Sequence, residues 1–163
     1  MLLIATHVVS ALAGLGLGFA ALAFPNGSPR HRAIGKAYLG AWLAVATSGC
    51  ILGADAPALS AFEILTIVGL GCVAFAYAAV RLRRRIGPRW LRWHYVWMSA
   101  SVAALIVTSV NQTILQTWGP YPRWMFWALV LSPVAILPAY HRALDRRFQP
   151  SASRDVRSRP TVA

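Results

Sequence analysis

The residues most able to do chemistry in this chain are three of its histidines and its single glutamate, Glu63. His31 and His94 each stand beside an arginine at the edge of an apolar segment, and His7 lies inside another apolar segment. Imidazole is a common ligand for transition metals and one of the axial ligands of haem iron. These positions predict a metal or cofactor site, if the fold brings the right side chains together.

His7 and Glu63 predict a polar site near one membrane face. An ionisable residue in or next to hydrocarbon is costly, so function is the first hypothesis for it. With Asn111 at a similar depth, they form a candidate pocket for a proton, a metal ion or a lipid headgroup. Their nitrogen and oxygen ligands suit a divalent transition metal, although two residues are fewer than such an ion needs. The structural alternative is an interhelical hydrogen bond from His7 and a solvated carboxylate at Glu63.

His31 and His94 predict a second candidate site near the opposite face. The loops expected at residues 25–36 and 81–93 share one compartment, so the two imidazoles could bracket a b-type haem or a transition metal. Against haem, bis-histidine ligation in a bundle needs two histidines on facing helices at one depth, and only His7 lies inside a predicted span. The alternative assigns His31, His94 and His141 to interfacial anchoring and phosphate contacts.

Five apolar segments are long enough to position these residues as membrane-spanning helices. A hydrocarbon core about 30 Å thick needs about 20 mostly apolar residues per helix. Of the 163 residues, 58% are hydrophobic and 12% are charged. The predicted spans are residues 2–24, 37–54, 61–80, 95–113 and 124–140. The sequence therefore predicts an all-α, polytopic transmembrane helical bundle over residues 1–148, which leaves no room for a separate catalytic domain.

The distribution of positive charge predicts the orientation of the bundle. Of the 16 Lys and Arg residues, all except Arg123 lie in three segments that follow the first, third and fifth spans. The positive-inside rule assigns these segments to the cytoplasm, with the N-terminus outside. Residues 149–163 are rich in Ser, Pro and Arg and predict a disordered basic cytoplasmic tail. We therefore expect a multi-pass protein of the bacterial inner membrane.

Charge and glycine spacing also bear on partners. The net charge is +12, but the arginines flank apolar spans, so we expect contacts with anionic lipid headgroups and no nucleic-acid binding. Gly14 with Gly18, and Gly49 with Gly53, predict close helix packing. That packing is expected inside the bundle; the alternative is a homo-oligomer or a membrane protein partner.

The fourth span carries a polar stripe. His94, Ser101 and Thr108 recur every seven residues, and Asn111 lies near the same side of the helix. These side chains would lack partners if they faced lipid. We therefore expect Ser101, Thr108 and Asn111 in the bundle interior.

Three local patterns resemble a family of bacterial multi-span membrane proteins named domain of unknown function 2306. They are a His before a Gly-rich apolar span (residues 6–18), a basic loop with a His-Arg pair (GSPRHRAIGKAY, residues 27–38) and a His-x-x-x-Met-Ser-x-Ser opening of a later span (HYVWMSAS, residues 94–101) that closes with Asn111. The chain departs from the family pattern at Lys36, where Arg is commoner, and at Val102, where Tyr is usual. The resemblance covers about residues 5–140.

The resemblance implies a polytopic membrane fold and picks out four positions of interest, and it implies no activity. These positions are His7, His31, His94 and Asn111.

Two functional hypotheses of different classes follow. The first is a non-enzymatic membrane component, or a small subunit that binds or transports a ligand, because the sequence has no phosphate-binding loop and no His-Glu-x-x-His helix. The second is a membrane redox protein that binds b-type haem or quinone, through His31 with His94 or through His7 with a non-histidine partner. Visible absorbance of the purified protein separates the two.

Overall fold

The computed structural model describes residues 1–148 apart from residues 56 and 59. The elements are α1 (Leu2–Ala23), α2 (Pro29–Leu52), α3 (Ala61–Arg81), α4 (Arg83–Ile86), the 3-10 helix η1 (Gly87–Arg89), α5 (Trp90–Trp118) and α6 (Arg123–Phe148). Five of these helical segments are long and apolar enough to cross a membrane. The prediction of an all-α, five-span protein is therefore confirmed. The predicted tail, residues 149–163, lies outside the described residues.

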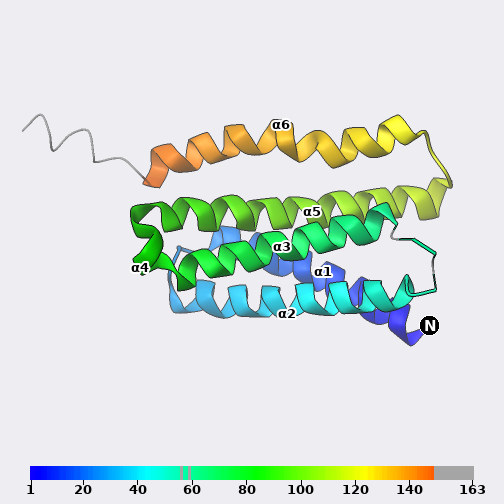
Figure 1. Ribbon diagram of the computed structural model, residues 1–163, viewed down its shortest axis with the longest axis horizontal. Coiled ribbons are helices and arrows are strands. Elements are labelled where there is room, and N and C mark those ends of the chain that lie inside the picture. Colours follow the sequence, from blue (N-terminus) through cyan, green and yellow to red (C-terminus); the bar gives the residue numbers. More distant parts are fainter. Residues whose placement is uncertain (56, 59, 149–163) are drawn as a thin grey trace, which may run out of the picture.

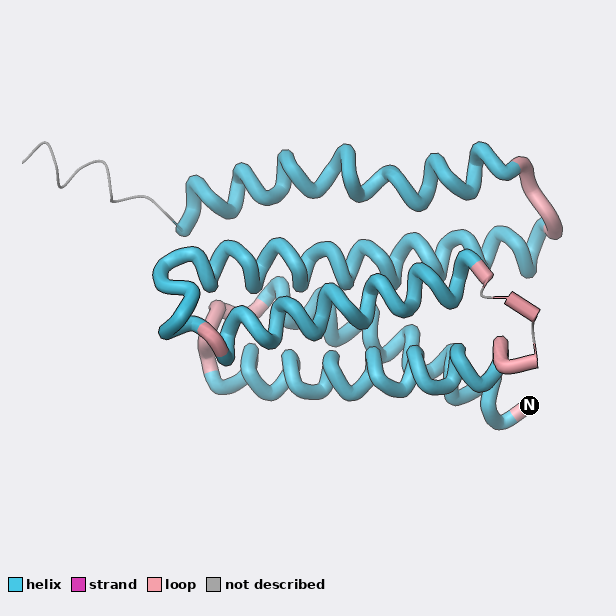
Figure 2. The backbone as a smooth tube through the Cα atoms, in the orientation of Figure 1, coloured by secondary structure: helices cyan, strands magenta, loops and turns pink. Residues whose placement is uncertain are grey.

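Four long helices form a bundle, and α6 lies along one side of it (Figures 1 and 2). α1 and α3 each pack against both α2 and α5, whereas α6 packs along α5. In the described chain the backbones of α2 and α5 make no close approach, so these two helices lie across the bundle from each other. A site that takes one residue from α2 and one from α5 therefore lies in the bundle core, where helical bundles build their cofactor sites.

Two helices begin earlier than the sequence analysis expected. α2 begins at Pro29 because the Ser28 side chain caps it, accepting the backbone N–H of His31 at 3.1 Å, and because proline suits the first helical position. α5 begins at Trp90, directly after η1. The expectation of loops at residues 25–36 and 81–93 was therefore wrong over most of their length. His31 and His94 are helical residues.

The core is built around two aromatic side chains of α2. Tyr38 and Trp42 are buried against Val73, Val102 and Leu105 from α3 and α5. The Tyr38 hydroxyl shares a hydrogen bond of 2.9 Å with the Ser101 hydroxyl of α5. Small residues admit these large rings, because apolar helices approach closely only where side chains are short.

The glycine pairs pack within the bundle. Gly14 and Gly18 are buried in α1, and a Cβ at Gly18 would lie 2.9 Å from a Val102 methyl group. Gly49 and Gly53 of α2 adjoin His7 and Glu63. These contacts take place between helices of one chain, and homo-oligomerisation stays a prediction.

Gly69 of α3 makes room for Trp42, and its substitution is expected to destabilise the fold. A Cβ at residue 69 would lie 2.1 Å from the Trp42 ring. Gly69→Ala should therefore lower the free energy of unfolding by about 1–3 kcal/mol through overpacking, measured by thermal unfolding in detergent. Gly71→Ala is the matched control, because a Cβ there meets no atom of the described chain within 4 Å and alanine favours the helix. Equal unfolding midpoints for the two variants would contradict this packing.

Candidate functional site

His31 and His94 are each held by a hydrogen bond to the backbone of a neighbouring helix. Nδ1 of His31 lies 3.1 Å from the Ala21 carbonyl oxygen of α1, and Nδ1 of His94 lies 3.1 Å from the Ala76 carbonyl oxygen of α3. A carbonyl oxygen only accepts, so Nδ1 carries the proton in both rings. In the neutral rings Nε2 therefore keeps its lone pair, which is the arrangement typical of metal-ligating histidines.

The fold brings the two rings together. Their centroids are 6.3 Å apart, and the ring planes make an angle of 74°. A metal–nitrogen bond is about 2 Å long, and a ring nitrogen lies little more than about 1 Å from the ring centre. Two imidazoles on opposite sides of one metal ion therefore have centroids roughly 6 Å apart. The spacing of His31 and His94 agrees with this value and is also that of an edge-to-face pair of rings in contact.

The pair supplies two imidazole ligands. In the described part of the chain, no group of three or more His, Cys, Asp or Glu side chains is placed to hold a metal. Haem needs only two axial protein ligands, because the porphyrin supplies four nitrogens itself.

Open space adjoins His31 on its own helix. Gly35 follows His31 by four residues, on the same face of α2. A Cβ built at Gly35 meets no atom of the described residues within 4 Å. Seven residues beyond each histidine, Tyr38 and Ser101 close the core with their hydrogen bond. The pair thus lies above this closed layer, and the described atoms leave room for a side chain at Gly35.

A second polar cluster joins α5 to α6 at the same end of the bundle. Asp145 accepts a hydrogen bond from the Tyr95 hydroxyl and forms an ion pair of 3.6 Å with Arg92. Nε2 of His141 lies 2.7 Å from the Ser99 hydroxyl oxygen, which donates its proton to the Val96 carbonyl, so His141 Nε2 donates to Ser99. The sequence alone does not reveal this cluster, because its residues are 50 and 42 positions apart in the chain. It fastens α6 to α5.

At the opposite end, His7 and Glu63 have separate partners. Ser48 donates to the Ala44 carbonyl and so accepts from Nδ1 of His7, at 2.9 Å. The Glu63 carboxylate accepts the backbone N–H of Ser60 at 2.6 Å, in a capping box at the start of α3. The structure thus places His7 in an interhelical hydrogen bond and Glu63 in a helix cap.

The rest of the polar stripe on α5 lies largely inside the bundle. Ser101 and Asn111 are fully buried, and the Thr108 hydroxyl donates to the Ala104 carbonyl at 2.8 Å. The Asn111 side-chain oxygen accepts a hydrogen bond from the Tyr121 hydroxyl in the loop before α6. Burial raises the pKa of the Tyr121 phenol above its usual value, so it stays protonated and donates at physiological pH.

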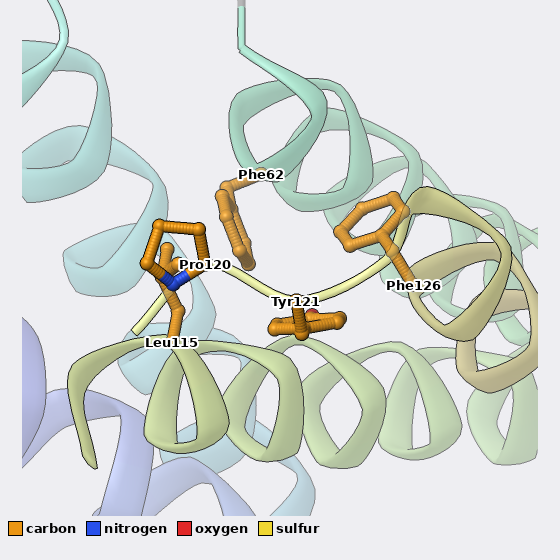
Figure 3. Close-up of a pocket in the computed structure, with 5 residues that line it drawn as sticks. All are labelled: Phe62, Leu115, Pro120, Tyr121 and Phe126. Atoms are coloured by element: carbon orange, nitrogen blue, oxygen red, sulfur yellow. The ribbon is translucent and has the colours of Figure 1, made fainter. Parts of the chain in front are cut away.

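An apolar hollow of about 170 Å³ lies beside this loop. Figure 3 shows Phe62 and Phe126 facing each other across it, above Tyr121. Leu115 and Pro120 complete the lining. The Tyr121 hydroxyl is the one polar side-chain group in this lining, and it donates to Asn111; the phenylalanine, leucine and proline side chains offer neither a ligand for a metal nor a group that transfers protons.

The comparisons with known proteins identify the family. The family model described as "Predicted membrane protein (DUF2306)" matches residues 4–148. No curated protein and no solved structure matches the chain. The match spans most of the sequence and confirms the resemblance drawn from residues 6–18, 27–38 and 94–101. This chain is a multi-pass membrane protein that belongs to the DUF2306 family.

Proposed function

We propose that this protein is a membrane electron carrier that holds b-type haem between His31 and His94. The observation that carries the proposal is the His31–His94 pair, with ring centroids 6.3 Å apart and both Nδ1 atoms bonded to backbone carbonyls. Nε2 is the nitrogen of each ring that keeps its lone pair, and it is the atom through which the ring would bind iron.

The residues of this chain have defined roles at such a site. His31 and His94 would hold the iron through Nε2, and the carbonyls of Ala21 and Ala76 fix the ring orientation and make Nε2 more basic. Tyr38 and the rest of the apolar core exclude water from the deeper side of the site. When bound, haem supplies reversible one-electron transfer.

The described contacts favour this role over a transport subunit. Two polar side chains that are fully buried in the bundle have partners: Ser101 bonds to Tyr38, and Asn111 bonds to Tyr121 and the Val107 carbonyl, whereas the buried Trp42 Nε1 has none among the described residues. A path for a polar solute needs polar groups that face a water-filled cavity. The buried pairs instead tie helices to each other.

The test of the proposed function is the visible spectrum of the protein purified in detergent from haem-replete cells. We expect a red preparation whose reduced form shows the sharp band of a b-type cytochrome, with about one haem per chain. A colourless protein without bound iron would refute the redox proposal, and the two histidines would then have a structural role.

We further propose that the basic end of the bundle faces the cytoplasm of a bacterium. The C-terminal ends of α1, α3 and α6, which adjoin the three basic segments, lie together at one end of the bundle (Figure 1). The positive-inside rule places such an end in the cytoplasm. A reporter enzyme that works only in the cytoplasm should be active when fused to the C-terminus and inactive when inserted at Asp55. The opposite pattern would reverse the orientation.

A further inference from the structure

The end of the bundle that holds His31 and His94 is ringed by exposed positive charge. We call this set the basic rim. Its members are Arg30, Arg32 and Lys36 of α2, Arg81 of α3, Arg83, Arg84 and Arg85 of α4, Arg89 of η1, Arg92 of α5 and Arg142 of α6. The acidic residue described at this end is Asp145, which pairs with Arg92 at 3.6 Å. The other described acids, Asp55 and Glu63, lie at the far end, around the α2–α3 connection.

His31 and His94 lie near the same end of the bundle. His31 is the third residue of α2, and His94 is the fifth residue of α5. At 1.5 Å per residue, both lie within roughly 8 Å of the helix ends, measured along the axis. Both side chains are partly exposed. The two imidazoles therefore lie close to the water-facing end of the bundle, beneath the rim.

The position of the rim favours a partner that approaches from water. α4 and η1 form the connection between α3 and α5, at the end of the bundle and not along its lipid-facing sides (Figure 1). Arginines at this end produce a positive electrostatic potential near His31 and His94. Such a field attracts partners of opposite charge and raises their association rate by about 10- to 1000-fold.

We infer that the basic rim is the docking surface for an acidic, water-soluble redox protein that exchanges electrons with the haem at His31 and His94. This inference rests on the proposed function and adds its partner. The exchange would be a single electron transfer: the reduced soluble protein would give up one electron to the group that His31 and His94 hold, and no bond or proton would change place. Charge complementarity supplies orientation and rate.

The experiment uses the full chain in nanodiscs of uncharged lipid. Reduced [2Fe–2S] ferredoxin, an acidic protein, is mixed with the oxidised chain, and the rate of haem reduction is followed at increasing salt. We expect the rate to fall about tenfold as salt screens the rim. Ferric cytochrome c, a basic protein, is the opposite probe, and its reduction by the reduced chain should become faster as salt rises.

The variant that tests the surface is the combined Arg83→Gln, Arg84→Gln and Arg85→Gln. It should slow reduction by ferredoxin at least about fivefold at low salt and leave the visible spectrum unchanged. Arg123→Gln is the matched control, because Arg123 is exposed at the first residue of α6, at the opposite end. This control should keep the rate of the unmodified chain.

Binding of ferredoxin to the nanodiscs separates the two proposals, because it needs no haem. Salt-sensitive binding that the Arg83–Arg85 variant weakens supports the docking of an acidic soluble protein on the rim; if the chain then carries no haem, the proposed function and the electron exchange fail, and the docking surface stands. A normal haem spectrum with salt-independent reduction overturns the docking surface. The docking surface is also overturned if the Arg83–Arg85 variant binds less anionic lipid but keeps the rate of reduction by ferredoxin. The rim would then be a binding site for lipid headgroups.

Discussion

His31→Ala and His94→Ala are each expected to remove the haem spectrum of the purified protein. Each substitution deletes one of the two axial ligands and leaves the opposite imidazole alone. Loss of a residue that merely orients a metal ligand costs about 10- to 100-fold in metal affinity, so loss of the ligand itself should lower haem occupancy by at least about 100-fold. Haem per chain, measured by pyridine haemochrome absorbance, is the readout.

Two other histidines provide matched controls. His7 bonds to Ser48 at the far end of the bundle, and His141 bonds to Ser99 between α5 and α6. His7→Ala and His141→Ala should keep the haem spectrum. Adding free imidazole to His94→Ala should restore part of it, because the small ligand fits the space that the ring leaves, and this rescue excludes misfolding. Full haem occupancy in His31→Ala or His94→Ala would refute the bis-histidine site.

Gly35→Leu is expected to block haem binding while the helices stay folded. Residue 35 lies one turn beyond His31 on the same face of α2, beside space in which a Cβ would meet no described atom within 4 Å. A leucine at residue 35 would fill the space that the porphyrin needs. Its Cβ would clash with none of the described atoms. Haem occupancy should fall by more than about tenfold, whereas helix content by circular dichroism should not change.

Gly40→Leu on the same helix is the control for this substitution. A Cβ at residue 40 also meets no atom within 4 Å in the described chain, but five residues turn the helix by well over a right angle from Gly35. This variant should bind haem normally. Equal haem occupancy in Gly35→Leu and Gly40→Leu would show that the ring does not lie beside residue 35, and would move the site away from this face of α2.

Local sequence carried enough information for the spans and for most helix ends. Long apolar segments define transmembrane helices because lipid offers no partner for backbone N–H and C=O groups, so the chain satisfies them within each helix. The capping pair Ser60 and Glu63 sets the start of α3 at Ala61, where the analysis placed it. The same kind of signal, Ser28 before Pro29, marks the start of α2 and was overlooked.

The polar cluster between α5 and α6 shows what local signals do not contain. Asp145 and His141 stand in a basic segment that predicted only a cytoplasmic boundary. Their partners Tyr95 and Ser99 lie in another span, 50 and 42 residues away respectively. Charge and hydropathy predict how deep a residue lies along the membrane normal. They do not predict how each helix is rotated about its axis, which decides the residues that face a neighbouring helix.

By itself the sequence determined an all-α bundle of five spans and the concentration of basic residues at one end. Only the tertiary structure decided that His31 meets His94 and that His7 does not meet a second histidine. The reason is physical: depth follows from the count of apolar residues along one helix, whereas the meeting of two rings depends on packing between helices. α1 supplies the carbonyl that holds His31, and α3 supplies the one that holds His94. Those contacts exist only when four helices are assembled.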